Sequence, residues 1–132
     1  MSELEKNRLQ PVRQALLTLH KALVDSERVT YESTVGVIRS PNHFLQLLMQ
    51  DPWFAWLQPV SQLIVSMDEA LGGKEPLTAA MVDALLKQTR QLLAPAENSE
   101  GFGRHYFDAL QRDPDVVMAH GELIKALGGR KR

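Results

Sequence analysis

The chain has 132 residues, of which 44% are hydrophobic and 23% charged, a composition typical of globular domains and too apolar for a disordered chain. Fifteen Lys and Arg stand against sixteen Asp and Glu, and the net charge of −1 excludes a general electrostatic attraction to nucleic acid or to an anionic membrane. The absence of cysteine excludes disulfides, thiolate nucleophiles and cysteine-based metal sites.

The two ends of the chain are both polar. The first residues are charged and lack the apolar run of a signal peptide, and no stretch of about 18 apolar residues predicts a membrane-spanning helix. We therefore expect one cytoplasmic domain over residues 1–129 with no membrane partner, followed by the basic tail Arg130-Lys131-Arg132. Three charges neutralise at most about three phosphates, so we do not expect a nucleic-acid partner, and a weak nucleic-acid adaptor remains an alternative.

Along the first segment an apolar residue recurs every three or four positions, which predicts one buried helix face. Its members are Leu9, Val12, Leu16, Leu19 and Leu23. Pro11 allows either a helix that starts near Gln10 or a longer helix from Ser2 that is kinked at the proline. The stretch from Val29 to Ile38 is rich in β-branched residues and contains a glycine, so it predicts either a helix extension or a loosely extended connection.

In the middle of the chain, Ser40-Pro41 and Asp51-Pro52 each join a capping side chain to a first-turn proline, which is the signature of a helix start. The first pair predicts a short helix, and the second predicts a central helix that continues to Gly72-Gly73. Pro59 lies inside this apolar pattern, where its missing N–H and its ring predict a bend.

In the C-terminal part, Thr78 has the properties of a helix cap, and Leu77 and Val82 have the spacing of a hydrophobic staple. Pro95 ends that helix and begins a loop, after which a short helix and a last helix starting at Asp113-Pro114 are expected. The sequence thus predicts an all-α fold of about six helices in a compact bundle or orthogonal array.

A motif that begins at His43 reappears at His105, displaced by 62 residues: His-aromatic-x-x-x-Leu-x-x-Asp-Pro. The helices after both copies end in Ala-Leu-Gly-Gly followed by a basic residue. This match predicts an internal duplication, with repeats over residues 9–74 and 78–130 that form two pseudo-symmetric three-helix halves. The alternative is chance recurrence of the same helix start and stop signals.

Metal sites in helical bundles are commonly built from Glu-x-x-His pairs, and none is present in the chain. No histidine has a glutamate three or four residues away, so we predict no metal and no cofactor.

The densest group of functional side chains consists of Arg104, His105, Tyr106 and Asp108. His43 occupies the position equivalent to His105 in the repeat, so the two histidines either line a shared cleft or each form a local hydrogen bond at a helix start. These five residues are candidates for a ligand-binding site.

His120 is a further candidate, because it falls in line with the apolar residues of the last helix. We expect a core histidine whose ring nitrogens are hydrogen-bonded, the alternative being a role in proton transfer or ligand binding. Gly121 beside it interrupts a helix at a cost of about 1 kcal/mol relative to alanine, which suggests close packing of another backbone or of a ligand.

Trp53, Phe54 and Trp56 lie within four positions, and successive helical positions are about 100° apart, so the three rings cannot share one narrow face. At least one ring is expected to point away from the buried stripe. Together with Val60, these residues are candidates for an interface with a protein partner or a second copy of the chain.

Taken together, the sequence carries no catalytic motif and predicts a helical protein that acts by protein–protein interaction or self-association, with a twofold dimer as the expected state. The alternative is an enzyme or small-ligand-binding domain that uses the Arg104–Asp108 region with His43 or His120.

Overall fold

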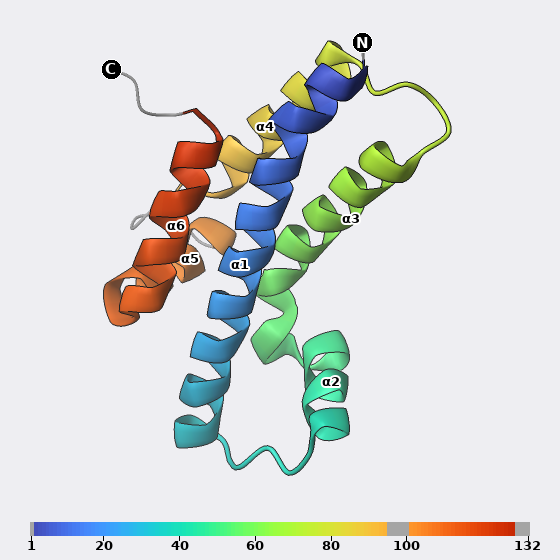
Figure 1. Cartoon of the computed structure of the whole chain (residues 1–132). Coiled ribbons are helices and arrows are strands. Elements are labelled where there is room, and N and C mark those ends of the chain that lie inside the picture. Colours follow the sequence, from blue (N-terminus) through green and yellow to red (C-terminus); the bar gives the residue numbers. More distant parts are fainter. Residues whose placement is uncertain (1, 95–100, 129–132) are drawn as a thin grey trace.

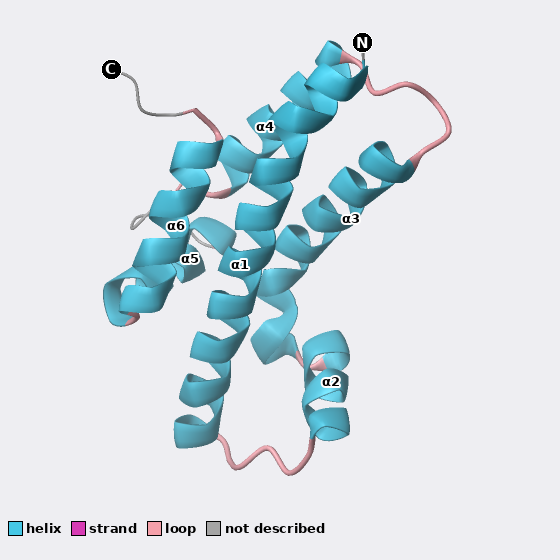
Figure 2. Cartoon of the chain, viewed as in Figure 1, coloured by secondary structure: helices cyan, strands magenta, loops and turns pink. Residues whose placement is uncertain are grey.

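The computed structural model describes residues 2–94 and 101–128, and these residues form six α-helices, one 3-10 helix and no strand (Figures 1 and 2). The all-α prediction is therefore confirmed. None of these helices is both long and apolar enough to cross a membrane. The elements are α1 (Ser2–Thr34), α2 (Pro41–Gln50), η1 (Pro52–Leu57), α3 (Gln58–Gly72), α4 (Ala79–Leu92), α5 (Phe102–Arg112) and α6 (Pro114–Ala126).

The long helix α1 is the centre of the fold, since α3, α4, α6 and η1 all pack against it (Figure 1). It runs for 33 residues, about 50 Å, with Pro11 inside it, which decides between the two predicted starts in favour of the longer helix. Its apolar stripe is fully buried, as predicted. The helix ends at Thr34, so the segment from Val29 to Ile38 is helical in its first part and a non-helical connection in its second.

The expectation of one bent helix from Pro52 to Gly72 is wrong. Residues Pro52–Leu57 form the 3-10 helix η1, and the α-helix α3 begins only at Gln58. Pro59 therefore lies in the first turn of a new helix, where its N–H would have no partner in any case and its fixed φ suits the helix. The change of helix type replaces the bend.

The predicted caps are present. The side chains of Ser40 and Thr78 accept hydrogen bonds from the backbone N–H of the third residue of α2 and of α4. Leu77 and Val82 are both buried, in agreement with a hydrophobic staple across the start of α4. Helix α5 begins directly after Gly101, whose φ of 81° is a conformation that favours glycine. Pro95, Gly129 and the basic tail lie outside the described residues.

The two copies of the repeated motif share their local chemistry. Asp51 and Asp113 each end a short helix through a backbone N–H and then cap the next element through the side chain, accepting from Trp53 N–H at 2.8 Å and from Asp115 N–H at 2.9 Å. The preceding helices differ, because α1 has 33 residues and α4 has 14. The duplication stays a prediction.

Gly121 does not mark a close contact. A Cβ added at this position would meet no atom within 4 Å, and the residue is exposed on α6. The expectation of close packing at this glycine is therefore wrong within the described fold, and the glycine serves no steric need there.

Candidate functional site

Tyr106 and His120, both predicted as site residues, come together between α5 and α6. A hydrogen bond of 2.6 Å joins the Tyr106 hydroxyl to His120 Nδ1, and the tyrosine is completely buried while the histidine is half-buried. Burial raises the pKa of the Tyr106 hydroxyl well above its usual range and lowers the pKa of the His120 imidazole. The pair is thus a neutral hydrogen bond between two helices, as expected for a core histidine.

A chain of ring contacts leads from this pair to η1. Phe102 stacks on Tyr106 with centroids 5.6 Å apart, and Trp56 contacts Phe102 at 5.3 Å and stacks on His105 at 5.1 Å. The indole Nε1 of Trp56 is buried and has no hydrogen-bond partner among the residues that the structure describes. These contacts hold α5 against η1. They also place two of the predicted site residues, His105 and Tyr106, in ring packing.

Arg104 and Asp108 form an ion pair of 3.1 Å along the outer side of α5, with both side chains about half exposed. Because positions four apart share a helix face, this pair points away from Tyr106, two residues after Arg104. The four predicted residues of α5 therefore divide between two directions and do not converge on a common point.

His43 does not join this group. Its Nδ1 accepts a hydrogen bond of 3.1 Å from the backbone N–H of Arg39, and its own backbone N–H donates to the cap Ser40. Among the described residues neither a hydrogen bond nor a ring contact links His43 to His105. His43 thus forms a local hydrogen bond near a helix start, which is one of the two predicted arrangements. His105 stacks on Trp56 instead, which neither arrangement predicted.

The predicted interface residues lie mostly inside the domain. Phe54 and Val60 are only 1% and 0% exposed, so they have no surface to offer a partner while the domain keeps this fold. Trp53 and Trp56 are half-buried, and the Trp53 indole donates to Glu27 Oε1 at 2.9 Å. At least one of the three rings was expected to point away from the buried stripe. The two tryptophans lie on different sides of η1, Trp53 against Tyr31 of α1 and Trp56 against Phe102 of α5.

A buried charged group was missed by the sequence reasoning. The side chain of Glu27 is 8% exposed and lies four residues after Leu23 on the buried stripe of α1. Its second oxygen accepts from Arg112 Nη2 at 2.5 Å, and Arg112 Nε donates to Ser26 Oγ at 3.1 Å. A carboxylate on an apolar stripe is a signal that could have been used, because such a group requires a partner.

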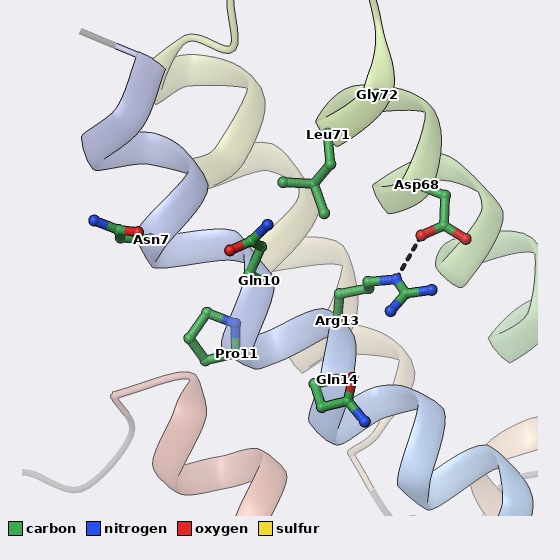
Figure 3. Close-up of a pocket in the computed structure, with 8 residues that line it drawn as sticks. All are labelled: Asn7, Gln10, Pro11, Arg13, Gln14, Asp68, Leu71 and Gly72. Carbon is green, nitrogen blue, oxygen red and sulfur yellow. Dashed lines mark hydrogen bonds and ion pairs between the residues drawn. The ribbon is translucent and has the colours of Figure 1, made fainter.

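A groove of about 640 Å³ lies between α1 and α3 (Figure 3). Arg13 reaches across it to Asp68 at 2.5 Å, as the dashed line in Figure 3 shows. Its other polar lining is made of carboxamides, Asn7, Gln10 and Gln14. About two turns after Arg13 on α1, a hydrogen bond joins His20 Nε2 to Ser61 Oγ. These polar groups cross-link the two helices. The Ser61 hydroxyl and the His20 imidazole form a hydroxyl–base pair at 2.9 Å, but among the described residues no side chain hydrogen-bonds to His20 Nδ1 to orient the ring.

Helix α2 packs on the core through Phe44, Leu47 and Leu48, which are partly buried, and leaves its other apolar residues exposed. Its sequence PNHFLQLLMQ contains five large apolar residues, and none of its ten residues is buried. Leu45 is 51% and Met49 is 63% exposed, and they lie four residues apart on one side of the helix. Val35 and Val37, in the connection that leads to α2, are also exposed. We call these four residues the α2 surface; Figure 1 shows the elements that carry it at one end of the molecule.

No group of three or more His, Asp or Glu side chains that could hold a metal ion occurs in residues 2–94 and 101–128. Comparisons with models of known protein families, with curated proteins and with solved structures each find no match. Any proposal for function therefore depends on the geometry of this chain alone.

Proposed function

We propose that the protein acts through protein–protein association, and that it forms a twofold dimer through the α2 surface. The observation that carries the proposal is an apolar helix with no buried residue. Helices of this composition normally bury their apolar side chains, and contiguous exposed apolar patches normally mark contact sites.

One side of α2 already has a partner within the chain. The ring of Phe44 contacts Phe54 with centroids 5.7 Å apart and lies under the Arg28 guanidinium at 5.0 Å. This anchoring fixes the helix on η1, so that Leu45 and Met49 are held in place on the other side. A helix that is already fixed in the free protein loses less backbone entropy on binding than a mobile one, which favours its use as a contact.

The charge pattern supports a second copy as the occupant. The ten residues of α2 include no Asp, Glu, Lys or Arg, so a charged partner finds no complementary group on this helix. Two copies of an uncharged helix can approach without like-charge repulsion, and the net charge of −1 adds little repulsion at long range. A twofold axis would pair Leu45 of one copy with Met49 of the other, an arrangement in which the same patch serves both copies.

The contact is small. A helix of ten residues is about 15 Å long, so α2 alone gives an interface at the small end of the range, and Val35 and Val37 at the same end of the molecule extend it. We therefore expect a dissociation constant on the order of micromolar.

Sedimentation equilibrium from micromolar to submillimolar concentration tests the proposal. The wild type should change from monomer to dimer over this range, while Leu45→Glu should remain monomeric because it places a carboxylate in the centre of the contact. Val65→Glu is the matched control, since Val65 is equally exposed but lies on α3. A monomeric wild type at all concentrations, or a dimer that both variants retain, would overturn the proposal.

A further inference from the structure

A second groove, of about 380 Å³, lies between α1 and α6. Figure 1 shows α6 on one side of α1 and α3 with α2 on the other, so this groove is separate from the α2 surface. Ala22 from α1 and Ala119 from α6 form its floor, where small side chains leave an apolar trough between the helices. Met118 lines its edge and is 71% exposed.

An exposed methionine beside an apolar trough is suited to bind an apolar group of a partner. The side chain is unbranched and polarisable, so it can adjust its shape to an apolar group that enters the groove. Met118 makes no contribution to the core, because the buried side of α6 is formed by Val116, Ala119 and Leu123.

The rim of the groove is acidic. Asp25, Asp113, Asp115 and Glu122 contribute four carboxylates, and Lys21, which pairs with Asp25 at 3.0 Å, is the one basic residue among those that line it. Asp113 and Asp115 stand at the N-terminus of α6, where negative charge also stabilises the helix dipole. The groove is therefore locally negative on a chain whose total charge is close to zero.

The order of these groups along α6 defines what would fit. Asp115 and Glu122 are seven residues apart, about 10 Å along the helix, and Met118 and Ala119 lie between them. A helix laid along the groove would meet carboxylates two turns apart with an apolar trough in the middle. Basic side chains at i and i+7, with apolar side chains at i+3 and i+4, reproduce this order on one helix face.

We infer that the groove between α1 and α6 is a docking site for a basic amphipathic helix of a partner protein. The apolar side chains of the partner enter the trough against Ala22, Ala119 and Met118, and its Lys or Arg residues pair with the rim. The apolar contact provides affinity, and the carboxylates select a basic partner and set its register.

Fluorescence anisotropy with a labelled peptide tests the inference. The probe is an amidated helical peptide of Ala and Gln that carries Lys at i and i+7 and Leu at i+3 and i+4, and a second peptide has Glu in place of Lys. The Lys peptide should bind the wild type, and the Glu peptide should bind at least about tenfold more weakly. Absence of binding by the Lys peptide, or equal binding of both peptides, would overturn the inference.

Two double variants separate the groove from the overall charge. Asp115→Asn with Glu122→Gln should weaken Lys-peptide binding about tenfold, which is the effect of losing the two exposed ion pairs that the Lys residues of the peptide make. Glu3→Gln with Glu69→Gln makes the same change in net charge at exposed positions outside the groove and should bind as the wild type does.

Met118→Ser should also weaken binding of the Lys peptide. Because this loss is apolar, a change in salt concentration should not reverse it. Equal effects of the two double variants would show non-specific charge attraction and would sink the assignment. This test is independent of the dimer proposal. The Leu45→Glu variant leaves the groove intact and should bind the Lys peptide as the wild type does.

Discussion

Arg112→Met is expected to destabilise the fold, because it removes the guanidinium partner of Glu27 while it keeps most of the aliphatic stem. The Glu27 side chain is 8% exposed, so its carboxylate would retain only the Trp53 indole N–H as a donor. Removing one member of a fully buried pair costs about 3–5 kcal/mol. Arg112 is 35% exposed and water can replace part of its contact, so we expect a loss of about 2 kcal/mol in the free energy of unfolding.

A double-mutant cycle separates the pair from its surroundings. Glu27→Gln combined with Arg112→Met leaves no uncompensated charge, so the double variant should be more stable than Arg112→Met alone by about 1 kcal/mol. Urea unfolding followed by circular dichroism at neutral pH gives the four free energies. If Arg112→Met lies within about 0.5 kcal/mol of the wild type, or if the second substitution recovers nothing, the network does not stabilise the fold as argued.

Two other stability effects follow from the same structure. Burial lowers the folded-state pKa of His20 and of His120 below 6.5, so the unfolded chain binds more protons than the folded chain as the pH falls through that value. The free energy of unfolding should therefore decrease on acidification from pH 6.5. A flat pH profile, in which the His20→Asn variant matches the wild type, would contradict this. Gly121→Ala should stabilise α6 by up to about 1 kcal/mol, because a Cβ at this position meets open space. Gly128→Ala should destabilise the fold, because the φ of Gly128 is 73°. Thermal melts that rank the two variants in the opposite order would refute the reasoning.

The helix boundaries that could be predicted from sequence are those set by short-range chemistry. Ser40, Asp51, Thr78 and Asp113 each accept from a backbone N–H two or three residues ahead, and such bonds need no information from the rest of the fold. The division of one expected helix into η1 and α3 was not predicted, because the apolar pattern of residues 52–72 fits either arrangement. Which one forms depends on where Phe54 and Leu57 find buried space.

The candidate site shows the same distinction. The helical register of His120 was sufficient to predict a hydrogen-bonded histidine on the buried side of the last helix. Its partner Tyr106 could not be predicted, because it depends on how α5 is packed on α6. The pairing of Glu27 with Arg112 spans 85 positions. It depends on how the C-terminal part of α1 approaches the C-terminal end of α5, which no local pattern encodes.

The packing of α1 against α6 joins two segments that are far apart in the chain. Helix α1 ends at residue 34 and α6 begins at residue 114, so about 80 residues are synthesised between them. At translation rates of about 5–20 residues per second, the ribosome needs about 4–16 s to produce that stretch. During this interval the side of α1 that later contacts α6 has no native partner. The apolar residues of α1 that pack on α6 therefore stay uncovered until α6 has left the exit tunnel, and the fold cannot be completed before then.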